Sequence, residues 1–342
     1  MKFNDLQPTK ENLCEAFKND LIGRNEDIKR FVKLLDSLSN SYSIALDGSW
    51  GSGKTFFVKQ AKLFIDAHNE HLNLIDEEDK KIFTSYDNSE NVTYQPQVTV
   101  YYDAWENDND SDPVLSLIYS IISSIDTNYK LKESDTLLNK AAAILDAFTG
   151  KNVREIASAL EGKDLLDDIR KQKNLELNIK AFLNSLLEER GDRLIIFIDE
   201  LDRCKPSFAV KLLERIKHYF TNDKITFVFS INLAEIQHTV KSYYGNEFDS
   251  CRYLDRFFDL RLSIPPIDME LFYTSIKFGK VQNVFSRQCV FEPVCKAVVS
   301  YYSLSLRETC RYLATCNMAT HEVIFNNKSL HDYNGLLFCI IY

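Results

Sequence analysis

The sequence predicts an α/β fold in which helices cover a parallel β-sheet. The strongest sign is residues 193–199, whose unbroken apolar centre is typical of a strand buried on both faces of such a sheet. Three further short runs rich in β-branched and aromatic residues, 42–46, 98–103 and 225–231, alternate with longer stretches of helical periodicity. Strands that alternate with helices form βαβ units, and these build a parallel sheet.

Helices are expected between and beyond these strands. Residues 24–38 carry apolar side chains at helical spacing, with Asn25 as the expected cap, and helical periodicity resumes over 55–67. A helix over 208–220 is expected between the two central apolar runs. Residues 260–264, stopped by two prolines, are the expected last strand.

The same pattern predicts the domain organisation. From 113 to 190 the sequence is helical and contains no strand signal, so we interpret this stretch as a helical insertion. Residues 1–112 and 191–267 then form the α/β core, and 268–342 form a C-terminal helical part.

Composition restricts the class of protein. The chain has 342 residues, 41 basic and 50 acidic side chains and a formal charge of -9, which argues against broad non-specific binding of nucleic acid. Its eight cysteines are scattered, as expected of buried free thiols in a reducing compartment. No signal peptide and no run of 18 apolar residues is present, so we expect a cytoplasmic protein without a membrane span of its own.

A glycine-rich segment between the first strand and the following helix matches the pattern G-x-x-x-x-G-K-[ST] in full. Backbone N–H groups of such a loop cradle phosphates at the helix N-terminus, the lysine reaches the β- and γ-phosphates, and the final hydroxyl binds Mg²⁺. The alternative is a glycine-rich turn that only caps a helix. The sequence therefore predicts ATP and Mg²⁺ as ligands and does not distinguish ATP from GTP. The candidate binding residues are Gly48, Ser49, Trp50, Gly51, Ser52, Gly53, Lys54 and Thr55.

Carboxylates follow the strand 193–199. Asp199 at its carboxyl end is expected to reach Mg²⁺, directly or through water. The adjacent Glu200 is expected to activate water for attack on the γ-phosphate, which favours hydrolysis over transfer to an acceptor. Asp202 competes with Glu200 for the role of base, and the sequence leaves both open. A solvated charged turn is the structural alternative for these residues.

Asn232 follows the strand 225–231. Its side chain could hydrogen-bond the attacking water or the γ-phosphate. A turn residue that ends the strand is an equally good interpretation.

Together these residues resemble the KAP family of P-loop ATPases. The resemblance rests on the phosphate loop with its internal Trp50 and on the run Asp199-Glu200-Leu201-Asp202-Arg203-Cys204-Lys205-Pro206, where the family usually has a second aspartate in place of Glu200. Weaker matches are residues 102–107 and 253–258, and the likeness spans roughly 20–315.

The resemblance implies a P-loop NTPase core of the additional-strand type, with about five strands in the order 5-1-4-3-2, related to AAA+ and STAND ATPases. It also implies a homo-oligomer in which Arg256 acts as an arginine finger on a neighbouring subunit, and it makes Arg307 similar to a sensor arginine. A surface arginine remains the alternative for each. Many family members have transmembrane helices where this chain has the amphipathic stretch 113–190.

Three functions remain from this reasoning. The first is an oligomerising ATPase that works as a conformational switch, with a protein effector as partner and with anti-phage defence as the role that the resemblance implies. The second is a nucleotide-gated binding module that scarcely hydrolyses ATP, and the third, disfavoured by Glu200, is a kinase. No base-reading motif is present. The uncharged stretch 335–342 predicts either a chain that continues beyond Tyr342 or a buried helix.

Overall fold

The computed structural model describes most of the chain in two compact units. The predicted segment 335–342 and the middle of the predicted insertion lie outside the described residues. The larger unit comprises residues 28–48 and 58–263, and the smaller one comprises residues up to 27, 49–57 and those from 264 onward. The described residues are 7–69, 75–87, 94–129, 144, 165–220, 222–275 and 291–325.

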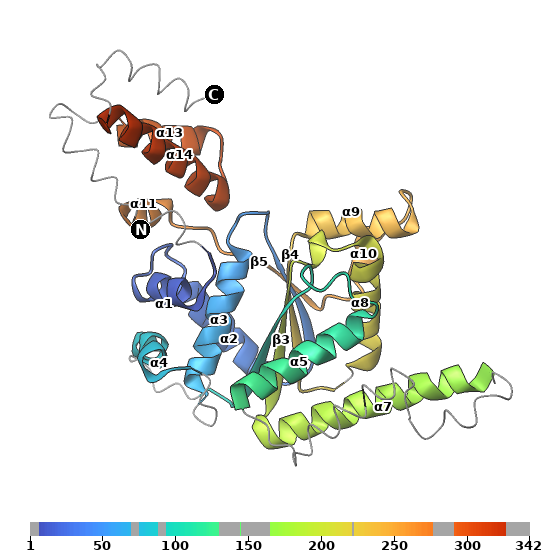
Figure 1. Ribbon diagram of the computed structural model, residues 1–342. Coiled ribbons are helices and arrows are strands. Elements are labelled where there is room, and N and C mark those ends of the chain that lie inside the picture. Colours follow the sequence, from blue (N-terminus) through green and yellow to red (C-terminus); the bar gives the residue numbers. More distant parts are fainter. Residues whose placement is uncertain are drawn as a thin grey trace. The chain divides into compact units, whose positions relative to one another are not determined.

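A five-stranded sheet forms the centre of the larger unit (Figure 1). All its neighbouring strands are parallel, as the alternation of strands and helices predicts. The order β2-β3-β4-β1-β5 confirms the order 5-1-4-3-2 that the family resemblance implies. The strands are β1 (Tyr42–Asp47), β2 (Gln97–Asp103), β3 (Arg193–Asp199), β4 (Ile225–Ile231) and β5 (Leu260–Ser263).

The register aligns the carboxyl ends of the strands. Asp199 of β3 pairs with Asp103 of β2 on one side and with Ser230 of β4 on the other. Ser230 in turn pairs with Leu46, one residue before β1 ends. The ends of four strands therefore meet at one edge of the sheet, which is where ligands bind in open α/β folds.

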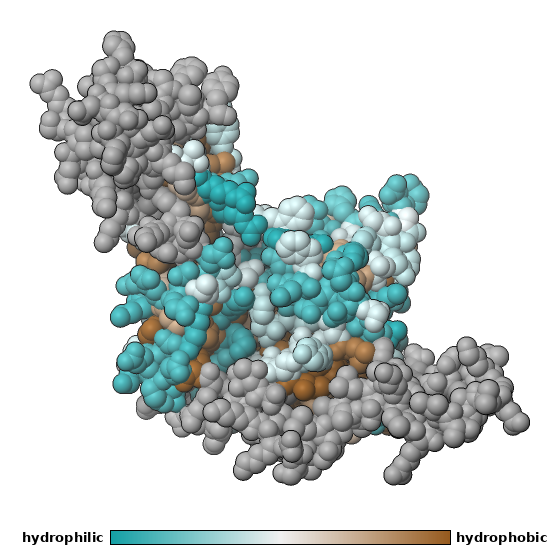
Figure 2. Space-filling view, viewed as in Figure 1, coloured by the Kyte–Doolittle hydropathy of each residue, from teal (hydrophilic) through white to brown (hydrophobic). Residues whose placement is uncertain are grey.

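Helices cover both faces of this sheet (Figure 1). On one face, side chains of β2, β3 and β4 pack with those of five helices in one hydrophobic cluster. The helices are α5 (Pro113–Tyr129), α7 (Leu165–Arg190), α8 (Pro206–Tyr219), α9 (Leu233–Tyr244) and α10 (Ser250–Leu254). Figure 2 shows apolar surface in the region of α5, one of these helices. Two of these helices, α5 and α7, lie within the predicted insertion 113–190, and their side chains pack on the sheet. That 113–190 is an insertion stays a prediction.

The opposite face is covered by α2 (Asn25–Ser37) and α3 (Lys54–His68) (Figure 1). Apolar positions at helical spacing are buried in both helices, as their sequences predict. The short helix α4 (Glu77–Thr84) follows them in the chain. One polar contact marks this face, because Thr99 of β2 donates a hydrogen bond to Asp66 of α3. Alternate β2 side chains therefore point to different helical layers.

The smaller unit contains α1 (Lys10–Lys18), α11 (Met269–Ser275), α13 (Phe291–Tyr301) and α14 (Leu306–Phe325). A hydrophobic cluster joins Ile22 to side chains of the three later helices. Asn25 does not have the expected capping role: it is the first residue of α2, and its side-chain amide donates to the carbonyl of Phe17 at 2.6 Å. Within the described parts of both units, no helix is sufficiently long and apolar to cross a membrane.

Candidate functional site: a phosphate loop and an acidic sheet edge

The phosphate loop connects β1 to α3. Its first residue is fixed to the sheet, since the Gly48 N–H donates to the carbonyl of Ile231 at 3.1 Å. Gly51 and Gly53 have φ angles of 81° and 85°, a region that side chains with a Cβ rarely adopt. The glycines are thus required by the backbone conformation of the loop.

Side chains of the smaller unit surround the loop. The buried Arg24 donates from Nη1 to the carbonyl of Ser52 at 3.0 Å and from Nη2 to the carbonyl of Pro265. Burial lowers the pKa of Arg24 to about 10, so the guanidinium stays charged at neutral pH. Sequence reasoning placed Arg24 only at the start of a helix and missed this contact with the phosphate loop.

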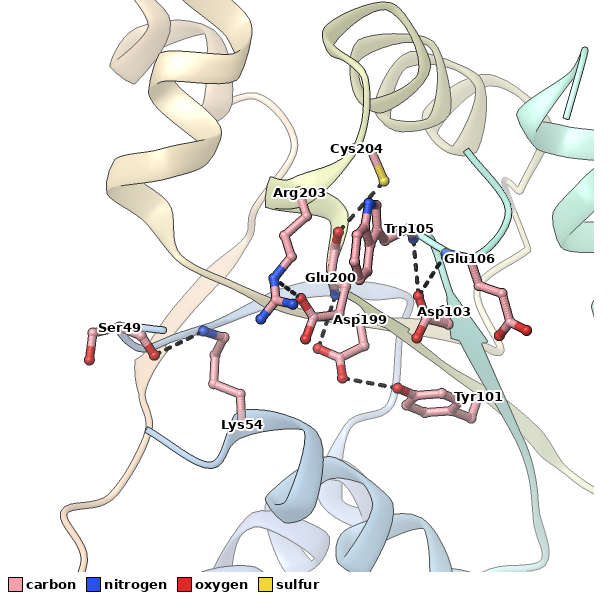
Figure 3. Close-up of polar contacts among 10 residues, drawn as sticks. All are labelled: Ser49, Lys54, Tyr101, Asp103, Trp105, Glu106, Asp199, Glu200, Arg203 and Cys204. Atoms are coloured by element: carbon pink, nitrogen blue, oxygen red, sulfur yellow. Dashed lines mark hydrogen bonds and ion pairs between the residues drawn. The ribbon is translucent and has the colours of Figure 1, made fainter. Parts of the chain in front are cut away.

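Lys54 lies at the start of α3, where its ammonium donates to the carbonyl of Ser49 at 3.2 Å (Figure 3). Thr55 follows in the first turn of the same helix. The ammonium of Lys54 thus contacts the backbone of the phosphate loop, next to the N-terminus of α3.

Arg307 lies beside the loop in the same unit. Its backbone N–H is 3.4 Å from the carbonyl oxygen of Gly51, while its side chain is exposed. The start of α14 is held by a reciprocal cap, in which Ser305 N donates to Glu308 Oε2 at 2.8 Å and Glu308 N donates to Ser305 Oγ at 3.4 Å. Arg307 therefore lies near the phosphate loop, and its role as a sensor arginine stays a prediction.

Asp199 ends β3 in the larger unit and is almost fully buried. Both its oxygens accept hydrogen bonds: Oδ2 from the phenol of Tyr101 and Oδ1 from the backbone N–H of Glu200, each at 3.0 Å (Figure 3). Burial and the nearby carboxylates raise the pKa of Tyr101, so the phenol remains a proton donor. Sequence reasoning missed Tyr101, although it precedes Asp103, the register partner of Asp199, by two residues on the same face.

Glu200 has an unusual backbone and environment. Its φ angle is 60°, in the left-handed region, and its side chain forms an ion pair with Nε of Arg203. Burial, followed by repulsion from Asp199, raises the pKa of Glu200 to about 7, against the opposing effect of Arg203. A carboxylate with a pKa near neutral pH is suited to accept a proton.

The residues after Glu200 form the short 3₁₀ helix η3 (Leu201–Arg203). Asp202 lies within this helix and is buried. Its burial does not decide whether Glu200 or Asp202 is the base. The Arg203 guanidinium lies 5.6 Å from the ring centre of Trp105, which is 52% exposed. Trp105 follows Asp103, whose Oδ1 accepts hydrogen bonds from the backbone of Trp105 and Glu106 (Figure 3). The acidic edge of the sheet thus consists of Asp103 and Asp199, which end β2 and β3, and of Glu200 and Asp202, which follow β3.

The two remaining predicted residues lie elsewhere in the larger unit. Asn232 caps α9, since its Oδ1 accepts from the N–H of Ala234 at 3.1 Å. This contact fits the turn interpretation, and a role towards phosphate stays a prediction. Arg256 is exposed after α10, and its carbonyl accepts a hydrogen bond from Lys217.

No group of three or more His, Cys, Asp or Glu side chains that could hold a metal ion occurs among the described residues.

Comparison with known proteins adds a family. Residues 24–278 match the KAP family P-loop domain. Among solved structures, the chain is similar to the ORC2 protein of Aeropyrum pernix in its ADPNP-ADP complexes, with 15% identity, coverage of 93% of this chain and 67% of that chain, and a TM-score of 0.39. No curated protein sequence matches.

Proposed function

The chain belongs to the KAP family of P-loop NTPases, and from this premise we propose that it is a Mg²⁺-dependent ATPase that acts as an oligomerising conformational switch. The observation that carries the proposal is the pair Asp199-Glu200 at the end of β3. This strand end is in register with the ends of β4 and β1, and β1 leads directly into the phosphate loop. A phosphate loop and such an acidic pair are the parts that hydrolysis of a nucleoside triphosphate needs.

The proposed roles follow from the chemistry of each group. Backbone N–H groups of the loop bind the phosphates, Lys54 neutralises their charge, and Thr55 and Asp199 hold Mg²⁺. The residues fit this ion, because Mg²⁺ keeps most of its ligands from water and phosphate and takes only one or two from the protein. Bound Mg²⁺ supplies charge neutralisation at the β- and γ-phosphates.

Glu200 is the proposed base. Its raised pKa suits proton acceptance from water. Its ion pair with Arg203, however, competes with the attacking water for the same carboxylate. Hydrolysis therefore requires that this ion pair opens or that a water molecule bridges it. We propose Arg256 as the residue that acts in a neighbouring subunit's site; its exposure supports this role. Arg307 and Asn232 are the proposed sensors of the γ-phosphate.

The ion pair of Glu200 also favours a second candidate function. If Arg203 keeps the carboxylate engaged in every state, the protein binds ATP and scarcely hydrolyses it, and nucleotide binding alone orders the chain for a protein partner. The proposed partner in both cases is an effector protein. Anti-phage defence is the proposed setting, and unchanged phage plating after gene deletion would remove it.

One experiment separates the two candidates. Mg²⁺-dependent ATP turnover is measured over a range of protein concentrations for the wild type, Glu200→Gln and the control Glu106→Gln, which removes an exposed carboxylate at the same sheet edge. We expect turnover to fall at least about a hundredfold in Glu200→Gln alone, with ATP binding retained. A rate that rises more than linearly with concentration supports Arg256 in trans. ATP binding without turnover in all three proteins supports the binding module.

A further inference from the structure

The carboxylate of Asp199 is held from two sides. Tyr101 donates its phenolic hydrogen to Oδ2 and the Glu200 N–H donates to Oδ1, both at 3.0 Å (Figure 3). Two donors on different oxygens fix the plane of the carboxylate, which one donor alone would leave free to rotate. Each oxygen has further lone pairs, so both can still accept a metal ion or its bound water.

Tyr101 is itself held in place. It lies on the face of β2 that is covered by α3, and the ammonium of Lys59 in α3 lies 4.4 Å from its ring centre. A cation over the ring face is attracted by the quadrupole of the ring, and this contact opposes rotation of the phenol away from Asp199. The phenol is therefore anchored by the sheet and by a helix before it reaches the carboxylate.

The neighbouring Tyr102 provides a natural comparison. It is the next residue of β2 and points to the opposite face, where its hydroxyl donates to Ser116 of α5 at 3.0 Å. The two tyrosines thus make hydrogen bonds of equal length from adjacent positions of one strand. Only the bond of Tyr101 ends on a carboxylate.

We infer that Tyr101 is a positioning residue for Asp199 and thereby sets the affinity of the site for Mg²⁺. This inference rests on the proposed function, in which Asp199 holds the ion. Groups that hydrogen-bond a metal ligand orient it, and their removal commonly weakens metal binding ten- to a hundredfold. In this inference Tyr101 acts through Asp199, whose carboxylate accepts its phenolic hydrogen bond.

The test compares Tyr101→Phe with Tyr102→Phe. Each substitution removes one hydroxyl and keeps the ring. Two quantities are measured in both variants and in the wild type: the Mg²⁺ concentration at which binding of a fluorescent ATP analogue reaches half of its Mg²⁺-dependent change, and the affinity for the same analogue in EDTA. We expect Tyr101→Phe to raise the required Mg²⁺ concentration about tenfold or more, with metal-free nucleotide affinity unchanged. Tyr102→Phe should leave the Mg²⁺ requirement within about twofold of the wild type.

Other outcomes contradict the inference in distinguishable ways. An equal Mg²⁺ requirement in the two variants overturns the positioning role while leaving the ATPase proposal intact. Loss of nucleotide affinity in EDTA for Tyr101→Phe alone overturns it as well, because the phenol would then contact the nucleotide. A wild type that neither binds nor hydrolyses Mg²⁺-ATP refutes the proposed function, and the inference with it.

Discussion

The phosphate loop offers a substitution whose cost can be worked out from two separate causes. Gly53 has a φ angle of 85°, and a Cβ at this position would lie 3.1 Å from Nη1 of Arg24. An alanine in the left-handed region costs about 1 kcal/mol. The close contact adds a further cost, because the buried guanidinium can move only by weakening its hydrogen bond to Ser52. A hydrogen bond from a charged group is worth about 1.5–3 kcal/mol.

We therefore expect Gly53→Ala to lower the free energy of unfolding by about 2–4 kcal/mol and to abolish binding of ATP. Gly245→Ala is the matched control, because Gly245 also has a positive φ, of 110°, but a Cβ at this position would meet nothing within 4 Å. Its φ of 110° and ψ of 155° lie in a region that is adopted almost only by glycine, so the substitution should cost about 1–3 kcal/mol of backbone strain and leave ATP binding unchanged. Chemical denaturation and titration with a fluorescent ATP analogue measure the two quantities. Retention of ATP binding in Gly53→Ala, or its loss in Gly245→Ala, would refute the reasoning.

Two further predictions concern the ends of β3 and β4. Asn232→Ala should destabilise the protein by about 1 kcal/mol in thermal or chemical unfolding, since it removes the cap of α9, and an unchanged stability would contradict that role. For Glu200, a folded-state pKa of about 7 above the ordinary value of 4.5 means that the native state binds more protons between these values, so stability falls as pH rises through this window. In EDTA, Glu200→Gln should therefore gain on the order of 1 kcal/mol relative to the wild type between pH 4.5 and pH 8, after allowance for partial solvent screening. If the difference in unfolding free energy between Glu200→Gln and the wild type did not change with pH, that would contradict the raised pKa of Glu200.

The strands were the most predictable part of the fold. The limits of β3 and β4 agree with the sequence to the residue, because a strand buried on both faces must be apolar along its length. The order of the strands in the sheet could not be predicted in this way, since periodicity does not say which strands are neighbours. It came from the family resemblance, and the observed order confirms it.

The missed contacts have physical reasons. Arg24 is almost fully buried, and it donates hydrogen bonds to Ser52 and Pro265, which follow it in the sequence by 28 and 241 positions. A charged residue at the start of an amphipathic helix is normally solvent-exposed. Alternation along β2 assigns Tyr101 to a face, but its partner follows only from the register that pairs Asp103 with Asp199. Both contacts depend on long-range packing that local sequence patterns do not encode.

The backbone at the end of β3 connects strain with the proposed chemistry. Glu200 adopts a left-handed conformation that glycine would adopt at lower cost. In that conformation its N–H donates to Asp199 and its carbonyl accepts from Arg203 N at 3.1 Å, which begins the 3₁₀ turn that returns the Arg203 side chain to the Glu200 carboxylate. The same turn thus orients the proposed metal ligand, exposes the proposed base to a competing cation and costs backbone energy. Strained non-glycine residues persist where the surrounding structure fixes them, commonly at functional sites, and here the strain falls on the residue that the ATPase proposal requires.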